Sequence, residues 1–529
     1  MVAANRNISP AALAWTPLVV AVLAFSWLWV DYQTFWIDDA FITLRYSLHL
    51  GEGFGPVYNS GERVEGYTSF LWMLVAALPL ASLPEPFALA LIKGSGWLIG
   101  LWILFRVWSF PGLDSARGPV GRWLVVLLAT SPRFLINCGD GMETPLFMLL
   151  LLECAHAMLR EPGRGSGALV GGLCAGLIWT RPESLPLLVA LPVVMMWSWR
   201  GDESRRADLR SWLWSFALVA GLPVVGHQIW RWSYYGHPFP NTYYAKATGS
   251  LSQRLMHGWR DVLFFVYRPK FLVDNWVQPV AIWLVLGLAG LTCWPHARAQ
   301  IPRARVWLGT LVLFVLFRVS FDLWSGSEAM GFHRFIVPVL IPLILLADEG
   351  LRLAWRGRLR APLLVLCVVA LGFNVRGHAE NLRMISGYER GLHQAHIPLG
   401  VWLRENYPRD TLAALGDAGA VPFFSRIRII DLWGLNDPVI AHLPGEYGAR
   451  RETADYAMNR RPDLVILWNK VPFQQEAKRG VAGGKSFDRA IARHPEFQAS
   501  YRFVREFVFR ERKEKVPGYY LDVFERRAE

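Results

Sequence analysis

The chain has 529 residues, of which 53% are hydrophobic and only 18% are charged, and it contains 26 tryptophans. This composition excludes a secreted, a disordered and a nucleic-acid-binding protein. The formal net charge is +13, and a basic excess in an apolar chain is typical of basic loops that alternate with membrane spans. Five cysteines are too few for a disulfide scaffold. The composition therefore predicts a polytopic membrane protein.

Apolar runs of about 20 residues predict the membrane spans. The first run, from Leu13 to Val30, is interpreted as an uncleaved span because Trp27 and Trp29 stand where a signal peptide would carry small residues. Further runs lie at about 87–107, 122–137, 143–159, 167–180, 183–199, 211–232, 276–294, 306–320, 334–348 and 361–375. The pattern predicts about eleven transmembrane helices in all.

A shorter apolar stretch, from Thr68 to Ser82, contains Pro79 and precedes Pro84. We expect it to form a helix at the membrane interface instead of a span. Leaving it out of the span count places the arginine-rich loops together on the cytoplasmic side. The opposite loops then face outward and carry most of the carboxylate, histidine and asparagine residues near the spans; they lie at about 31–86, 138–142, 181–182, 233–275 and 321–333.

From about residue 376 onward the chain becomes charged. Short β-like runs, Thr411 to Leu415, Arg426 to Asp431 and Asp463 to Trp468, alternate there with helical stretches. The sequence thus predicts a transmembrane domain at 1–375 and a soluble α/β domain at 376–529, also outside. Asp417 and Asp431 are interpreted as turn or strand-end residues of that domain.

Two adjacent carboxylates, Asp38 and Asp39, follow the first span directly. Desolvating such a pair costs several kcal/mol unless it meets water, a cation or a substrate. One interpretation is structural: Asp38 caps the helix that follows, and Asp39 adds favourable charge to its first turn. The other is catalytic, with one of the two carboxylates acting as a base toward an acceptor hydroxyl.

The other outward loops add cations and further polar groups, and together they predict a site with two poles. Cations are expected to hold a phosphate, with arginine favoured for a forked grip; the candidates are Arg181, His237, Lys246, His333 and Arg334. Carboxylates, amides and aromatic rings suit a sugar or an acceptor; the candidates are Glu65, Tyr67, Glu143, Glu183, Asn241 and Tyr244. The structural alternatives are ion pairs with the nearby glutamates and an interfacial aromatic belt. The sequence contains no Walker motif, zinc ligand pair or Gly-x-Ser-x-Gly elbow.

Several motifs together resemble the polytopic C-superfamily glycosyltransferases (GT-C), and within them the terminal β-arabinofuranosyltransferases of mycobacterial arabinan synthesis and their relatives in other bacteria. The long first-loop motif is the most specific of them. The matching runs are Asp38-Asp39-Ala40-Phe41-Ile42-Thr43-x-Arg45-Tyr46, Asn59-x-Gly61-Glu62-Arg63-Val64-Glu65-Gly66-Tyr67-Thr68, Gly141-Met142-Glu143-Thr144-Pro145-Leu146, Thr180-Arg181-Pro182-Glu183, Tyr235-Gly236-x-Pro238-x-Pro240-Asn241-Thr242-Tyr243-Tyr244-Ala245-Lys246 and Arg334-Phe335-x-Val337-Pro338. The resemblance reaches into the outer domain through Gly416-Asp417-Ala418-Gly419 and Asp431-Leu432-Trp433-Gly434-Leu435-Asn436-Asp437.

This resemblance implies an α-helical polytopic membrane protein with the GT-C fold and interfacial helices in the first outer loop. It also implies transfer of a sugar, arabinofuranose above all, from a polyprenyl-phosphate donor to a glycan or protein acceptor at the outer face of the bacterial inner membrane. No cofactor or metal is expected, although a divalent metal at Asp38 and Asp39 stays open. The alternatives are transfer of mannose or aminoarabinose to protein or lipid A, and a non-catalytic lipid-sugar carrier or flippase, which a site confined to one side fits poorly. Whether the anomeric centre inverts also stays open.

Overall fold

The computed structural model describes residues 10–112, 123–246, 251–266, 284–292, 302–325, 334–355, 360–470, 484–510 and 517–527. The chain forms two compact units. The first, here called the helical unit, comprises Met1–Gln33, Lys93–Gly226 and Ser250–Leu382. The second, here called the sheet unit, comprises Thr34–Ile92, His227–Gly249 and Arg383–Glu529.

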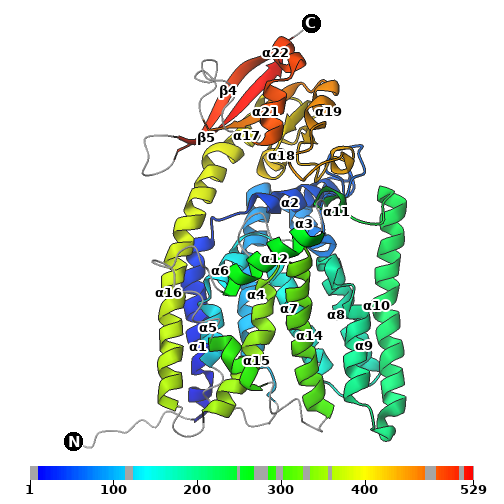
Figure 1. The fold of residues 1–529 in the computed structure, drawn as a ribbon, viewed down its shortest axis with the longest axis vertical. Helices are drawn as coiled ribbons and strands as arrows, with labels where there is room; N and C mark the ends of the chain where they lie inside the picture. The colour runs from blue at the N-terminus through cyan, green and yellow to red at the C-terminus, as the bar shows by residue number, and fades with distance from the viewer. Residues whose placement is uncertain are drawn as a thin grey trace, which may run out of the picture. The chain divides into compact units, whose positions relative to one another are not determined.

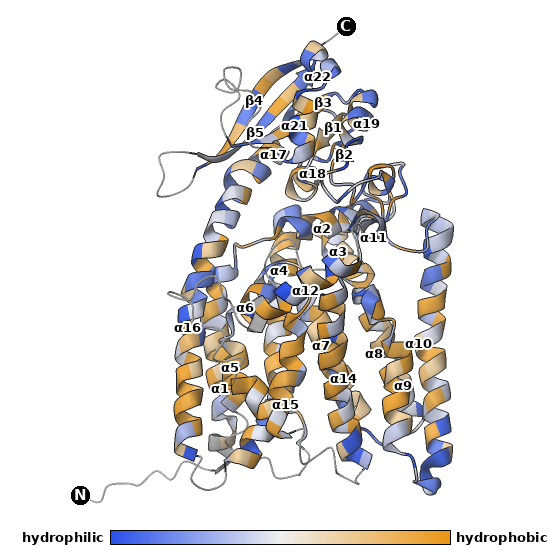
Figure 2. Cartoon of the chain, in the orientation of Figure 1, coloured by the Kyte–Doolittle hydropathy of each residue, from blue (hydrophilic) through white to orange (hydrophobic). Residues whose placement is uncertain are grey.

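Five helices within the described ranges are long and apolar enough to cross a membrane, and a bent pair of helices can be counted as a sixth. The protein is therefore a multi-pass membrane protein, while the expected count of about eleven spans stays a prediction. The five are α1 (Pro10–Trp29), α4 (Glu85–Trp108), α10 (Arg206–Tyr235), α14 (Pro302–Ser325) and α16 (Arg360–Gly391). Hydrophobic residues cover most of α14 and of the first half of α16 (Figure 2).

Prolines divide several of the other apolar runs into shorter helices. The run at 122–137 is split at Pro132 into α5 (Leu124–Ala129) and α6 (Pro132–Gly139), and α6 and α7 (Thr144–Met158) form the bent pair, at 115°. Such breaks follow because proline lacks an amide donor and disfavours helix in the residue before it. Further helices of the helical unit are α8 (Arg164–Thr180), α9 (Leu187–Ser198), α12 (Leu251–Val266) and α15 (Leu340–Ala354). Helix α7 packs against α8, and α9 against α14 (Figure 1).

The apolar stretch that was left out of the span count forms the short helix α3 (Phe70–Ser82). Its 13 residues extend over about 20 Å, which is less than the hydrocarbon thickness of a bilayer. Helix α3 packs against α2 (Asp38–Gly51) within the sheet unit. The exclusion of this stretch from the spans agrees with the structure, and its place at the membrane interface stays a prediction.

One five-stranded sheet organises the C-terminal part of the chain, with the strand order β2-β1-β3-β5-β4 (Figure 2). The strands are β1 (Leu412–Leu415), β2 (Arg428–Asp431), β3 (Leu464–Asn469), β4 (Tyr501–Arg510) and β5 (Pro517–Arg526). The first three strands are parallel, whereas β5 is antiparallel to β3 and β4. The three β-like runs are therefore confirmed, and the β4–β5 hairpin was not predicted. Helices α17 (Ile397–Asn406), α18 (Ala420–Ser425), α19 (Thr453–Asn459), α21 (Ser486–Ala492) and α22 (Pro495–Ser500) complete this part.

The core of the sheet unit is shared between the C-terminal part and the first loop. Ile42, Tyr46 and Tyr67 are buried in the same hydrophobic cluster as Leu415 and Val523. The sheet unit therefore includes segments that the linear boundaries at 1–375 and 376–529 assign to the membrane part. Removing the chain beyond residue 376 would expose this core, so point substitutions are the better probes of the unit's role.

Candidate active site

Asp38 is the first residue of α2, and its carboxylate is bound by the backbone that leads into α18. Asp38 Oδ1 accepts a hydrogen bond from the Ala420 amide at 2.8 Å, and Oδ2 accepts one from the Gly419 amide at 3.1 Å. The Asp38 amide donates to the hydroxyl of Tyr388 at 2.7 Å. No side chain caps α2, so Asp38 does not cap the helix that it begins. It fixes the first loop to the C-terminal part of the chain instead, with Asp39 beside it.

The charges around Asp38 adjust its proton affinity. Burial raises the pKa of Asp38 to about 6, and the nearby His396 opposes that rise. His396 Nε2 lies 3.1 Å from Asp417 Oδ2. Burial alone would raise the pKa of Asp417, but His396 outweighs it and leaves that pKa below its ordinary value. Asp38 is therefore a carboxylate that can gain and lose a proton close to neutral pH, which is what a general base requires.

Gly419 lets this contact form. A Cβ at Gly419 would lie 2.0 Å from the Asp38 carbonyl oxygen and 2.5 Å from its carboxyl carbon. We expect Gly419→Ala to lower the free energy of unfolding by about 1–3 kcal/mol, because overpacking forces the backbone apart, and to lower turnover as Asp38 moves. Gly387→Ala in α16 is the control, since nothing lies within 4 Å of a Cβ there. Thermal unfolding and turnover of both variants test this, and wild-type values for Gly419→Ala would contradict it.

Most other residues of the first-loop motif make structural contacts within the sheet unit. The guanidinium of Arg45 is buried and donates to the carbonyl oxygens of Tyr58 at 2.7 Å, of Ile427 at 2.6 Å and of Pro422. Asn59 pairs with the backbone of Ile429, accepting from its amide at 3.0 Å and donating to its carbonyl at 2.8 Å. These contacts hold the loop against β2 and α18, so much of the motif's specificity is structural.

Glu65 and Tyr67, two of the predicted sugar or acceptor residues, are buried in the sheet unit and engaged by protein groups. Arg231 Nε donates to both Glu65 carboxylate oxygens, at 2.8 and 3.1 Å. The hydroxyl of Tyr67 lies 3.1 Å from that of Tyr235. This geometry favours a supporting role for both residues.

Asn241 and Tyr244 lie at the start of α11 (Asn241–Lys246). The Asn241 side chain donates to three backbone carbonyls, those of Gly434, Leu435 and Asp437, at 2.9–3.1 Å. Tyr244 is partly exposed, and its ring lies 4.7 Å from the ring of His442. Asn241 thus fixes the loop after β2, and Tyr244 packs partly against the core of the sheet unit.

His237 and Lys246, two of the predicted phosphate-binding cations, are exposed on the same segment of the sheet unit as Tyr244. The His237 ring stacks on that of His442 at 5.5 Å and lies 5.6 Å from that of Tyr244. The Lys246 ammonium lies 6.0 Å from the ring centroid of Tyr447. The structure thus brings imidazole, phenol and ammonium groups together on one surface.

In the helical unit, Arg181 is held by both of the predicted carboxylates. It lies 2.9 Å from Glu143 and 3.6 Å from Glu183, and it donates to the Thr144 hydroxyl at 3.0 Å. Arg318, a buried arginine of α14, also reaches Glu183, at 3.2 Å. The sequence analysis missed Arg318, although a lone arginine inside an apolar run is itself a signal for a functional or paired residue.

Arg334 is buried in the helical unit, with its guanidinium 5.7 Å from the ring centroid of Phe335. His333 lies outside the described residues. No group of three or more His, Cys, Asp or Glu side chains that could hold a metal occurs in the part of the chain that the structure describes.

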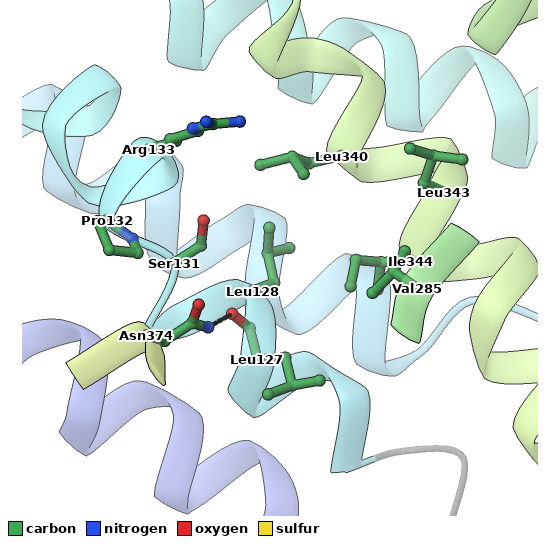
Figure 3. Close-up of a pocket in the computed structure, with 10 residues that line it drawn as sticks. All are labelled: Leu127, Leu128, Ser131, Pro132, Arg133, Val285, Leu340, Leu343, Ile344 and Asn374. Atoms are coloured by element: carbon green, nitrogen blue, oxygen red, sulfur yellow. Dashed lines mark hydrogen bonds between the residues drawn. The ribbon is translucent and has the colours of Figure 1, made fainter. Parts of the chain in front are cut away.

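A small cavity of about 40 Å³ lies between α5, α15 and α16 in the helical unit (Figure 3). It is mainly apolar, with Arg133 at its edge and Asn374 donating to the Leu127 carbonyl at 2.9 Å. None of the predicted site residues is among the residues that line this cavity.

Comparison with known proteins gives three results. A family model described as "Domain of unknown function (DUF8728)" matches residues 382–524. A curated terminal β-(1→2)-arabinofuranosyltransferase of Mycobacterium tuberculosis is 29% identical over 298 residues, which is 51% of this chain and 42% of that protein. One of the same description from Corynebacterium glutamicum is 25% identical over 390 residues, covering 64% of this chain and 52% of that protein. The chain thus spans about half the length of these curated relatives.

Two solved structures show the fold. The archaeal oligosaccharyltransferase AglB from Archaeoglobus fulgidus, in complex with an inhibitory peptide and a dolichol-phosphate, has a TM-score of 0.58 at 11% identity, covering 94% of this chain and 80% of that one. ArnT from Cupriavidus metallidurans, bound to undecaprenyl phosphate, has a TM-score of 0.58 at 11% identity, covering 98% of both chains. These findings confirm the resemblance to the GT-C glycosyltransferases and the GT-C fold.

Proposed function

We propose that this protein is a membrane glycosyltransferase that moves a sugar, arabinofuranose above all, from a polyprenyl-phosphate donor to an acceptor hydroxyl at the outer face of the bacterial inner membrane. The description of the curated relatives supports the reaction and the sugar. The polyprenyl phosphates bound to the fold neighbours support the kind of donor. The description of the curated relatives supports a glycan acceptor, and the inhibitory peptide bound to AglB supports a protein acceptor.

The observation that carries this proposal is the setting of the first-loop carboxylates. Asp38 is held at two oxygens by backbone amides, with a pKa near 6, and Asp39 follows it on the same turn of α2. A fixed carboxylate of this proton affinity suits proton removal from an acceptor hydroxyl as the new glycosidic bond forms. Asp38 and Asp39 are both candidates for the base, and their single variants separate them.

The leaving phosphate gains negative charge in the transition state, and fixed cations stabilise it there. We assign this role first to Arg181 and Arg334, whose forked guanidinium groups match phosphate oxygens. Both terminal nitrogens of Arg181 already contact Glu143 and Glu183, so Arg181 would contribute its positive charge at a fixed position, and the forked grip would fall to Arg334. His237, Lys246 and His333 are further candidates, and the rings of Tyr244 and His442 suit the face of an acceptor sugar.

The test is sugar transfer by the purified full chain in lipid nanodiscs, with a panel of donors. Polyprenyl-phosphate arabinofuranose, mannose and aminoarabinose are each offered with a glycan, a peptide and lipid A. We expect transfer of arabinofuranose to the glycan. Transfer of another sugar alone would overturn the assignment of the sugar, and no transfer with any pair would overturn the enzymatic proposal in favour of a lipid-sugar carrier.

A second candidate is an aminoarabinosyl-type transferase acting on lipid A. ArnT shares the fold of this chain along 98% of both lengths at 11% identity, and a shared fold does not identify the sugar. The same donor panel separates the two candidates, because each predicts a different sugar in the product.

A further inference from the structure

We infer that His396, held by Asp417, is a positioning residue for the proposed base: it places a fixed positive charge near Asp38 and favours the ionised form of that carboxylate. This inference rests on the proposed function. It assigns roles to His396 and Asp417, two C-terminal residues that the sequence analysis did not place in the site.

The imidazole of His396 is buried and bound on both nitrogens. Nε2 lies 3.1 Å from Asp417 Oδ2, and Nδ1 lies 3.2 Å from the hydroxyl of Tyr519 on β5. His396 ends a five-residue π-helical segment, Leu392–His396, between α16 and α17. Such π-helical turns occur frequently at functional sites. Nδ1 also lies 3.3 Å from the carbonyl oxygen of Gly391, so the ring is held by the loop after β1, by β5 and by the end of α16.

The loop after β1 connects this pair to Asp38. Asp417 follows β1, and two and three residues later the amides of Gly419 and Ala420 bind the Asp38 carboxylate. The loop lies at the carboxyl end of a parallel strand, where ligands of α/β sheets commonly bind. A single short loop thus sets the positions of both Asp38 and the carboxylate that holds His396.

The balance of charge at this site favours a protonated His396. Asp417 is paired with it, and the charge of Asp38 acts on it. Asp39 acts on Asp38 in turn, Lys485 and Asp488 act on Asp417, and the phenols of Tyr388 and Tyr519 complete the surroundings. Two carboxylates next to one imidazole stabilise its charged form, and that charge in turn favours the ionised form of Asp38.

In the proposed reaction His396 neither gives nor takes a proton. The acceptor hydroxyl loses its proton to a first-loop carboxylate as its oxygen bonds to the anomeric carbon. The bond from that carbon to the donor phosphate breaks, and its electron pair leaves on the phosphate oxygen. The contribution of His396 is electrostatic, so its removal should alter the pH at which the base works more than the binding of the donor.

The decisive variant is His396→Gln, followed through the pH dependence of kcat/KM. We expect the acidic limb, near pH 6 in the wild type, to move upward by about one pH unit, since a neighbouring opposite charge lowers a carboxyl pKa by that order. Activity would then fall on the order of ten-fold at pH 5.5 and stay close to wild type at pH 8. His396→Lys, which keeps a cation, should restore part of the shift.

His378→Gln in the helical unit is the matched control. His378 also has an aspartate on Nε2, Asp31 at 2.8 Å, and a tyrosine hydroxyl on Nδ1, that of Tyr32 at 3.1 Å. Loss of this second His–Asp–Tyr set should lower stability and leave the acidic limb in place. An unmoved limb in His396→Gln, or an equal shift in His378→Gln, would overturn the inference while the proposed function stands.

A readout without catalysis keeps the two proposals separate. In the full chain carrying ¹⁵N-labelled histidine, we expect the imidazole of His396 to be protonated at pH 7, and to become neutral at that pH in Asp417→Asn. A neutral His396 in the wild-type protein would overturn the inference. If no donor is used at all, the proposed function fails, and this titration still decides whether the charged pair exists.

Discussion

Asp38→Asn is expected to lower kcat by a factor on the order of 10²–10⁴, the usual contribution of a general base. The KM for the donor should change little, because the substitution removes an interaction made in the transition state. Asparagine can still accept a hydrogen bond from the Gly419 or Ala420 amide through its one carbonyl oxygen, so the fold should persist. Initial rates at saturating donor measure the effect, with Asp39→Asn beside it and the exposed Asp410→Asn as the control.

The pH dependence gives this prediction a distinct signature. Since burial raises the pKa of Asp38 to about 6, wild-type activity should fall as the pH drops through 6 and the base is protonated. Stability should change in the opposite sense: a pKa raised above the unfolded value contributes stability at low pH that is lost as the pH rises through 6. Above pH 7 the wild type has lost this contribution, so the thermal stability of Asp38→Asn relative to the wild type should be highest there. If both Asp38→Asn and Asp39→Asn keep wild-type turnover, neither residue is the base.

The second large effect is expected at Arg181. If Arg181 binds the phosphate, the substitution Arg181→Gln should lower turnover on the order of a hundred-fold. Arg181 is also a partner of Glu143 and Glu183. The substitution should therefore destabilise the protein by about 3–5 kcal/mol, because a buried carboxylate is left without its counter-ion. Turnover per folded molecule, measured with thermal stability, separates the two contributions.

Arg318→Gln is the matched control for that experiment, since Arg318 shares Glu183 with Arg181 but was not assigned to the phosphate. It should lower stability and leave the turnover of the folded fraction near the wild-type value. Arg334→Gln is expected to behave like Arg181→Gln. Normal turnover in a less stable Arg181→Gln protein would leave only the structural role for this arginine.

Local patterns in the sequence predicted the parts of the fold that depend on local structure. The three parallel strands follow from short β-like runs, and the short helix α3 follows from the length of its apolar stretch and the charges of the loops. Asp38 and Asp39 could be selected as candidate site residues because placing two carboxylates beside a membrane span costs free energy. The count of spans is harder to predict, because prolines such as Pro132 and Pro182 divide apolar runs into shorter helices.

Long-range contacts could not be predicted from such patterns. His396 lies in a helical stretch that also contains His393, and only the fold brings it to Asp417 and Tyr519. Likewise, Arg45 and Asn59 belong to a motif that is easily interpreted as a substrate site, yet each also binds a partner that lies more than 350 residues away in the chain. A residue can thus belong to a family motif because it holds two distant segments of the chain together, and not because it binds the substrate.

The central claim is tested most directly by the stoichiometry of a single reaction. Purified full-length protein is incubated with polyprenyl-phosphate arabinofuranose and a glycan acceptor, and the new glycosidic bond and the released polyprenyl phosphate are both quantified by mass spectrometry. We predict that the two products appear in equal amounts with the wild-type protein, and that both are lost in the double variant Asp38→Asn, Asp39→Asn. Released phosphate without a new glycosidic bond, or equal product formation by the double variant, would contradict the account.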